Sequence, residues 1–124
     1  MRRIRAHAVI GRQRARHRHR YRSYMQSPLW WERRARWIEE EQNRSGGRVR
    51  CAVCQGPWAD LHHMSYERMG RERHSDLVAL CRTDHDWVHA AYDAGRWRGM
   101  DYETVMRRLL AVARQKRGEP DVQR

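Results

Sequence analysis

The stretch that decides the fold is Leu61–His89, LHHMSYERMGRERHSDLVALCRTDHDWVH, which holds five histidines and one cysteine. His62 and His63 are adjacent in a predicted strand, where neighbouring side chains point to opposite faces. His85 and His89 are four positions apart in a predicted helix, so their Cβ atoms lie about 5–6 Å apart on one face. Two imidazoles in this arrangement can bind one ion at about 2.0–2.1 Å each. Because at most one member of the adjacent pair joins them, the other is free to act as a general base.

The order of these residues resembles that of the HNH endonucleases. Their ββα-metal motif has His-His or Asp-His on the first strand, Asn or Asp at the second strand, and one or two His on the helix. The matching positions here are His62-His63, Asp76, His85 and His89. The flanking residues resemble phage and bacterial members with a zinc knuckle, over about residues 24–92. The elements that agree in order are Tyr24-Met-Gln-Ser-Pro-Leu-Trp30, Cys51-Ala-Val-Cys54, Tyr66, Gly70-Arg-Glu72 and Asp76-Leu77 to Leu80-Cys81.

The resemblance implies an α+β fold, with a small ββα-metal domain and a treble-clef-like zinc knuckle flanked by helices. His63 takes the position of the general base, and an imidazole with a pKa of about 6.5 can accept a proton from water at neutral pH. One catalytic divalent ion would be held by His62, His85 and His89 and would stabilise charge on the phosphate and the departing 3′ oxygen. Histidine favours zinc or nickel, whereas magnesium prefers oxygen; the sequence leaves zinc, nickel, magnesium and manganese open. The resemblance also implies a single-metal mechanism that leaves 5′-phosphate ends.

Two aspartates each have two open roles. Asp76 either orients His63 through a ring N–H, as carboxylates do beside functional imidazoles, or is a residue of the turn that starts the second strand. Asp84 stands where knuckle proteins usually have the last cysteine of a second Cys-x2-Cys. It either binds structural zinc, since carboxylates do so at about 2.0–2.2 Å, or caps the following helix. The predicted structural zinc ligands are Cys51, Cys54, Cys81 and Asp84.

Charge predicts a polyanionic partner. The chain has a formal net charge of +12, and 26 of its 27 basic residues are Arg. DNA is the expected partner, with RNA as an alternative and a membrane surface disfavoured. Guanidinium groups bind phosphate through a bidentate fork, although a GC-rich genome would explain the same bias. The predicted nucleic-acid contacts are Arg71, Arg73 and Arg82 near the site, and Arg14, Arg16, Arg18 and Arg20 near the N-terminus.

The chain divides into three predicted segments. Residues 1–23 contain nine Arg, three His and no acid, which predicts a disordered basic tail that either binds phosphate or is merely solvated. Residues 24–95 form the HNH nuclease domain, and residues 96–124 form an amphipathic helix with a short tail. The predicted helices cover about 28–42, 82–94 and 102–116, and the predicted strands about 59–64 and 76–80. The predicted core stripes are Trp30, Trp37 and Ile38 in the first helix and Val105, Met106, Leu109, Leu110 and Ala113 in the last.

The predicted function is a metal-dependent DNA endonuclease. No run of about 18 apolar residues and no signal sequence is present, and three cysteines with one Cys-x2-Cys suit metal binding in a reducing cytosol. The expected location is therefore the cytoplasm, and the resemblance to phage and bacterial HNH proteins implies a bacterial or phage-infected cell. Two rivals are a non-catalytic zinc-binding module for nucleic acid and a toxin nuclease acting on RNA. Sequence preference, nicking against double-strand cleavage and oligomeric state stay open.

Overall fold

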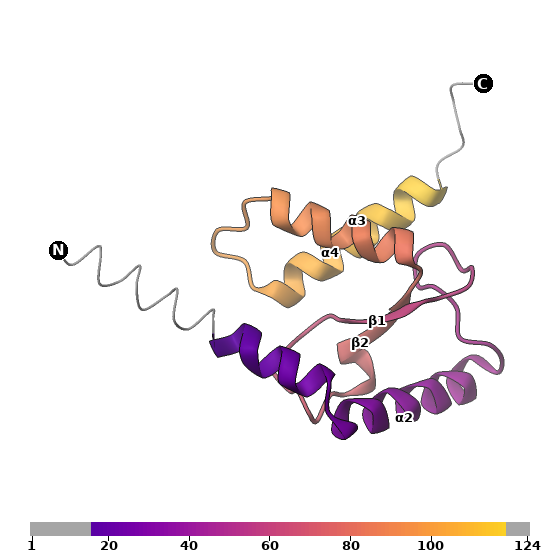
Figure 1. Cartoon of the computed structure of the whole chain (residues 1–124). Helices are drawn as coiled ribbons and strands as arrows, with labels where there is room; N and C mark the ends of the chain where they lie inside the picture. Colours follow the sequence, from indigo (N-terminus) through magenta and orange to yellow (C-terminus); the bar gives the residue numbers. More distant parts are fainter. Residues whose placement is uncertain (1–15, 119–124) are drawn as a thin grey trace.

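A two-stranded sheet lies between two layers of helices in the computed structural model, which describes residues 16–118 (Figure 1). A helix over residues 16–25, here called the N-terminal helix, precedes the labelled elements. These elements are α2 (Pro28–Ser45), β1 (Asp60–His63), the 3-10 turn η1 (His74–Asp76), β2 (Leu77–Leu80), α3 (Arg82–Ala94) and α4 (Tyr102–Gly118). The predicted helices and strands are confirmed, with ends that shift by three residues or fewer.

β1 and β2 pair antiparallel, with His62 opposite Val78 and His63 opposite Leu77. A two-stranded sheet is marginal in water by itself, so its stability depends on the helices packed on it. Between the sheet and α2 lies a core formed by Tyr24, Trp30, Trp37, Leu61, Leu77 and Ala79. The side of α3 and α4 carries a second core that includes Met64, Leu80, Val88 and the apolar stripe of α4. Alternation along β1 therefore sends His62 and His63 into different environments.

Helix boundaries follow from local chemistry. Ser27 caps α2, because its Oγ accepts a hydrogen bond from the backbone of Trp30, and Pro28 occupies the first turn. Gly46 ends α2 with a φ of 72°, a conformation that glycine adopts without steric cost, and its N–H binds the carbonyl of Gln42. The stripe Val105, Met106, Leu109, Leu110 and Ala113 is buried, as predicted, and both Trp30 and Trp37 are core residues.

The predicted disordered tail is wrong for residues 16–23, which are helical. Aromatic contacts offset the charge repulsion there, since Tyr21 packs against Tyr66 with ring centroids 5.4 Å apart. Arg16, Arg18 and Arg20 are exposed on this helix, whereas Arg14 lies outside the described residues. Among the helices of residues 16–118, none combines the length and the apolar character needed to cross a membrane.

Candidate metal centre and active site

Three histidines from two elements converge beside the sheet. His62 from β1 and His85 and His89 from α3 each offer a ring nitrogen within 4.8 Å of the others. The Nε2 atoms of His85 and His89 are 2.9 Å apart, which is also hydrogen-bond length. Two nitrogens bound to one tetrahedral ion at about 2.0–2.1 Å are about 3.3 Å apart, so only a small adjustment is needed to surround one ion. The cluster could hold a metal, as the sequence predicted.

The contacts of these rings favour the form that binds a cation. His85 Nδ1 lies 3.1 Å from a carboxylate oxygen of Asp60; because that oxygen only accepts, Nδ1 carries the hydrogen and Nε2 keeps its lone pair. His62 Nε2 lies 3.2 Å from the Met106 sulfur, which leaves Nδ1 for an ion. Burial, with the neighbouring His85 and His89, lowers the pKa of His62 to about 3. Burial also lowers the pKa of His89, so both rings are neutral at neutral pH.

His63 faces the other side of β1 and is 2 % exposed. Its Nε2 lies 2.8 Å from Glu72 Oε2, and Nδ1 is buried without a hydrogen-bond partner among the described residues. Since the carboxylate accepts, Nε2 carries a hydrogen, and in the neutral ring Nδ1 carries the lone pair. The ring stacks on Tyr66 at 5.2 Å and lies near Trp30 and Tyr21. The geometry gives His63 an oriented ring with one free basic nitrogen.

Glu72 is the site residue that the sequence reasoning missed. It is buried, and the Tyr24 hydroxyl donates a 2.8 Å hydrogen bond to its other carboxylate oxygen. Burial raises the pKa of Glu72, but the hydrogen bonds from His63 and Tyr24 outweigh it and hold the pKa below its usual value. The only signal in the sequence was its place in Gly70-Arg-Glu72, to which no role was assigned.

Asp76 does not contact His63, so the prediction that it orients that ring is wrong. Arg68 donates two hydrogen bonds to its carboxylate, at 2.6 and 2.7 Å, and the backbone of Arg73 donates a third at 2.9 Å. These contacts lower the pKa of Asp76, with Arg68 as the largest cause. Asp76 is therefore the turn residue of the alternative interpretation, and it closes η1 at the start of β2.

Three cysteines and Asp84 form a second candidate metal site, with ligand atoms within 4.8 Å of one another. The sulfurs of Cys54 and Cys81 are 3.9 Å apart, close to the about 3.8 Å that two sulfurs on one tetrahedral zinc would show. Each sulfur accepts a backbone N–H at 3.4 Å, from Val53 to Cys51, from Gly56 to Cys54 and from Asp84 to Cys81. Such donors favour thiolate, the form that binds zinc, but burial outweighs them at Cys81 and raises the pKa of that thiol to about 12.

Asp84 is not the cap of α3, so that alternative is wrong. Cys81 is the capping residue, and its sulfur accepts from the backbone of Asp84. The Asp84 side chain is turned toward the cysteines instead, with Oδ2 at 3.3 Å from Cys51 and 3.1 Å from Cys81. Its other oxygen, Oδ1, is bound by Arg117 of α4 at 2.9 and 3.2 Å. The carboxylate is therefore held in position to be a fourth ligand.

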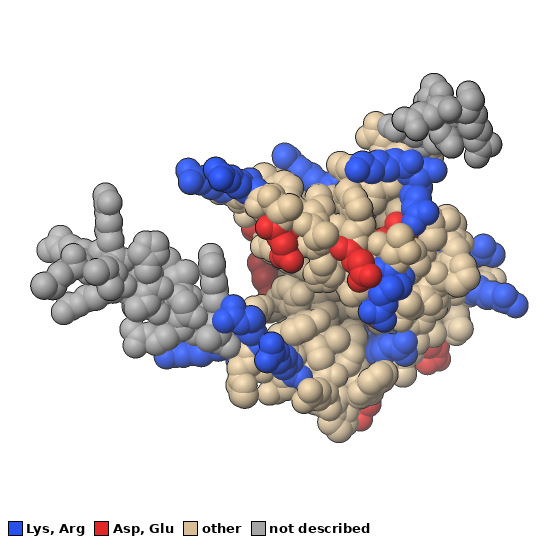
Figure 2. Space-filling model, turned by 45° about the horizontal axis from the view of Figure 1, so that its top comes forward, with Lys and Arg blue, Asp and Glu red and all other residues tan. Residues whose placement is uncertain are grey.

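The arginines predicted near the site are all exposed at the surface. Arg71, Arg73 and Arg82 are available to solvent, and Arg82 pairs with Asp60 at 3.3 Å. Figure 2 shows one face of the molecule, where Lys and Arg side chains project around a central hollow and a few acidic side chains lie beside it. The charge of this face is thus mixed rather than uniformly basic.

Comparison of the chain with protein-family models, with curated proteins and with solved structures gives no significant match. The resemblance to HNH endonucleases therefore rests on the sequence motifs alone.

Proposed function

We propose that the protein is a metal-dependent endonuclease that hydrolyses phosphodiester bonds in DNA. The observation that carries the proposal is that the two adjacent histidines of β1 have different surroundings. His62 joins His85 and His89 in a cluster suited to one ion, while the adjacent His63 keeps a free nitrogen and is oriented by a carboxylate. Metal-assisted hydrolysis requires ligands for the ion and a separate general base. One strand and one helix supply both here.

Each residue has a defined task in this proposal. His63 accepts a proton from water at Nδ1, and Glu72 holds the ring in the required tautomer and stabilises the positive charge that forms on it. His62, His85 and His89 would hold the divalent ion, and Asp60 fixes the orientation of His85. When bound, the ion supplies stabilisation of the negative charge that develops on the phosphate oxygens.

Access to His63 requires a movement of the aromatic side chains around it. The ring is almost fully enclosed, and Tyr21 of the N-terminal helix and Tyr66 both lie against it. Burial, with a smaller contribution from the neighbouring Tyr66, raises the pKa of Tyr21 to about 12, so this side chain is neutral at physiological pH. Its displacement therefore exposes no unpaired charge and would open a path for water to Nδ1.

A non-catalytic zinc-binding module is the alternative. The cysteine cluster would serve such a module equally well, but the three convergent histidines and the buried pair of His63 and Glu72 would have no task in it. Burying a titratable pair costs free energy that a purely binding module gains nothing from.

The proposal is tested with supercoiled plasmid. We expect the purified protein to convert it to nicked or linear DNA when a divalent ion is added, and to stop when the ion is withheld, because the histidines alone supply no charge stabilisation. The readout is gel electrophoresis over a series of Zn, Ni, Mg and Mn. A His63→Gln protein purified in parallel controls for contaminating nuclease. A plasmid left intact with every ion would overturn the proposal in favour of the binding module.

A further inference from the structure

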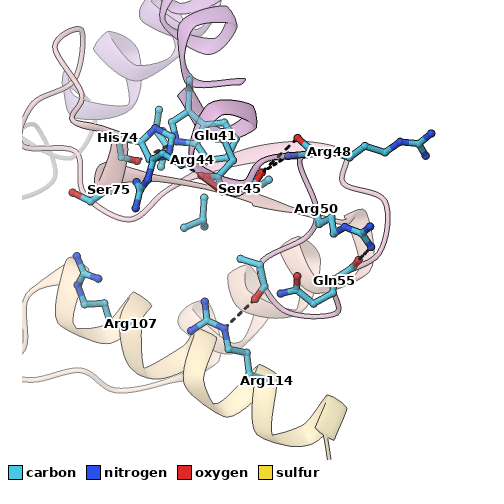
Figure 3. A pocket seen from close by; sticks show the side chains of 16 residues that line it. Glu41, Arg44, Ser45, Arg48, Arg50, Gln55, His74, Ser75, Arg107 and Arg114 are labelled. Carbon is cyan, nitrogen blue, oxygen red and sulfur yellow. Dashed lines mark hydrogen bonds and ion pairs between the residues drawn. The ribbon is translucent and has the colours of Figure 1, made fainter. Parts of the chain in front are cut away.

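A strongly basic cleft lies apart from both candidate metal sites. It has a volume of about 700 Å³ and is formed by the end of α2, the segment after it, β2 and α4. None of the histidines or cysteines of the candidate metal sites lines it. Figure 3 shows Arg107 and Arg114 of α4 on one side of the opening, with Arg44 and His74 on the other side.

The charge of this cleft is not neutralised by its own walls. Its arginines are Arg44, Arg48, Arg50, Arg107 and Arg114. The single acidic residue of the lining is Glu41, and its carboxylate is already bound by His74 at 3.0 Å. Of these five arginines, only Arg107 has an acidic partner within residues 16–118, the partly exposed Glu103 one helical turn away. Such an exposed pair is worth little and is readily exchanged for another anion.

The remaining contacts leave most guanidinium groups free. Arg114 donates through Nε to the carbonyl of Ala52 at 3.0 Å, which fixes the side chain but uses one of its donors. Arg50 makes only a 3.4 Å contact to the carbonyl of Gln55. Several like charges facing one cleft repel each other, and bound anions with several oxygens remove that repulsion. Guanidinium forks match phosphate oxygens in geometry and in charge.

We propose that this arginine cleft binds the phosphate backbone of a nucleic acid, at a site separate from the histidine cluster. A cleft of this volume is much larger than one phosphate group and can take several consecutive ones. The inference rests on the proposed function for the choice of nucleic acid as the polyanion, while the unneutralised charge is a property of the cleft itself. The cleft would hold DNA by charge and shape rather than by base sequence.

The test is a binding measurement with a matched control. One variant combines Arg44→Gln, Arg107→Gln and Arg114→Gln, and the control combines Arg36→Gln, Arg96→Gln and Arg98→Gln, which are exposed and outside the cleft. Both lose the same charge, so any general effect of net charge is equal. Binding of a fluorescent DNA duplex is measured by anisotropy over a salt series, without added divalent ion and without chelator, and a gel verifies that the duplex stays intact.

We expect the cleft variant to bind more weakly and to lose about 2.7 from the slope of log affinity against log salt, since each duplex phosphate contact contributes about 0.9. The control should lose less than about 0.9. Equal losses in the two variants, or an unchanged slope in the cleft variant, would overturn the inference. If melting shows that the triple variant is unfolded, Arg44→Gln with Arg107→Gln replaces it, with an expected loss of about 1.8.

This binding measurement and the plasmid assay together separate the inference from the proposed function. A protein that binds DNA through the cleft but never cleaves it retains the inference and loses the nuclease. A protein that cleaves DNA while the cleft variant binds like the wild type retains the nuclease and loses the inference. A wild-type protein that does not bind the duplex at all overturns the cleft proposal directly.

Discussion

Replacement of His63 by alanine is expected to reduce DNA cleavage by about 100- to 10,000-fold, the usual cost of losing a general base. Metal affinity and DNA binding should remain close to those of the wild type, because His63 is not one of the residues that could hold the ion. The measurement is the single-turnover rate constant on a labelled duplex, with ion binding followed by calorimetry.

A second variant, His63→Gln, distinguishes the loss of the base from a folding defect. His63→Ala leaves a cavity beside Trp30 and Tyr66 and removes one partner of the buried Glu72. His63→Gln can still donate a hydrogen bond to that carboxylate but has no comparable basicity. If His63→Gln melts like the wild type and cleaves at the wild-type rate, the assignment of the base is wrong.

The structure places Glu72, and not Asp76 as the sequence predicted, beside the ring of His63. Glu72→Gln should lower the cleavage rate, though less than loss of the base, because the amide stabilises a charged imidazole poorly. Asp76→Asn should leave the rate nearly unchanged and lower thermal stability instead, since its carboxylate binds Arg68 and the turn. The opposite pattern would restore Asp76 as the orienting residue.

If the cysteine cluster holds structural zinc, removal of that zinc is expected to unfold most of the protein. Structural zinc in small domains binds with about 10–16 kcal/mol, which is comparable to the whole stability of about 5–15 kcal/mol of a typical domain. The cluster ties the knuckle at Cys51 and Cys54 to the start of α3 at Cys81, and the buried Cys51 belongs to the core that holds α4. We expect circular dichroism to show loss of helix after treatment with a strong chelator and its return when zinc is added back.

Two comparisons test whether the cysteine cluster holds zinc. Metal analysis of a His89→Ala protein, in which the histidine site is weakened, should give about one zinc per chain if the cysteine site is filled. Asp84→Ala should then lose zinc and melt at a lower temperature, while Arg117→Gln should retain zinc because the arginine contacts only the outer oxygen of Asp84. A chelator-treated protein that contains no zinc and melts like the untreated protein would show that the cluster is not structural.

The pair of His85 and His89 could be read from the sequence because its geometry is local, whereas the choice of His62 as the third member came from the resemblance to HNH endonucleases. The spacing of His85 and His89 on a helix and the alternation of a strand are set by backbone periodicity, and both survive in the fold. The ends of α2 could also be predicted from the sequence, since Ser27, Pro28 and Gly46 act through contacts with their near neighbours in the chain.

The contacts of Glu72 and Asp76 could not be read in the same way. Glu72 lies in a long loop, and its partner Tyr24 is 48 positions away, so only tertiary packing brings them together. The prediction of disorder in residues 16–23 was wrong for a related reason. Their charge argued for disorder, but the contact of Tyr21 with Tyr66 depends on a loop whose position the sequence does not reveal.

The most direct test of the central claim measures how the cleavage rate depends on the concentration of divalent ion in the wild type and in His89→Ala. His89 is exposed enough for its replacement to leave the core intact. If His62, His85 and His89 hold the ion used in cleavage, His89→Ala should need a much higher ion concentration for half-maximal rate and recover activity as the ion is raised. Two curves with the same midpoint would contradict the account, because the ion that supports cleavage would then lie elsewhere.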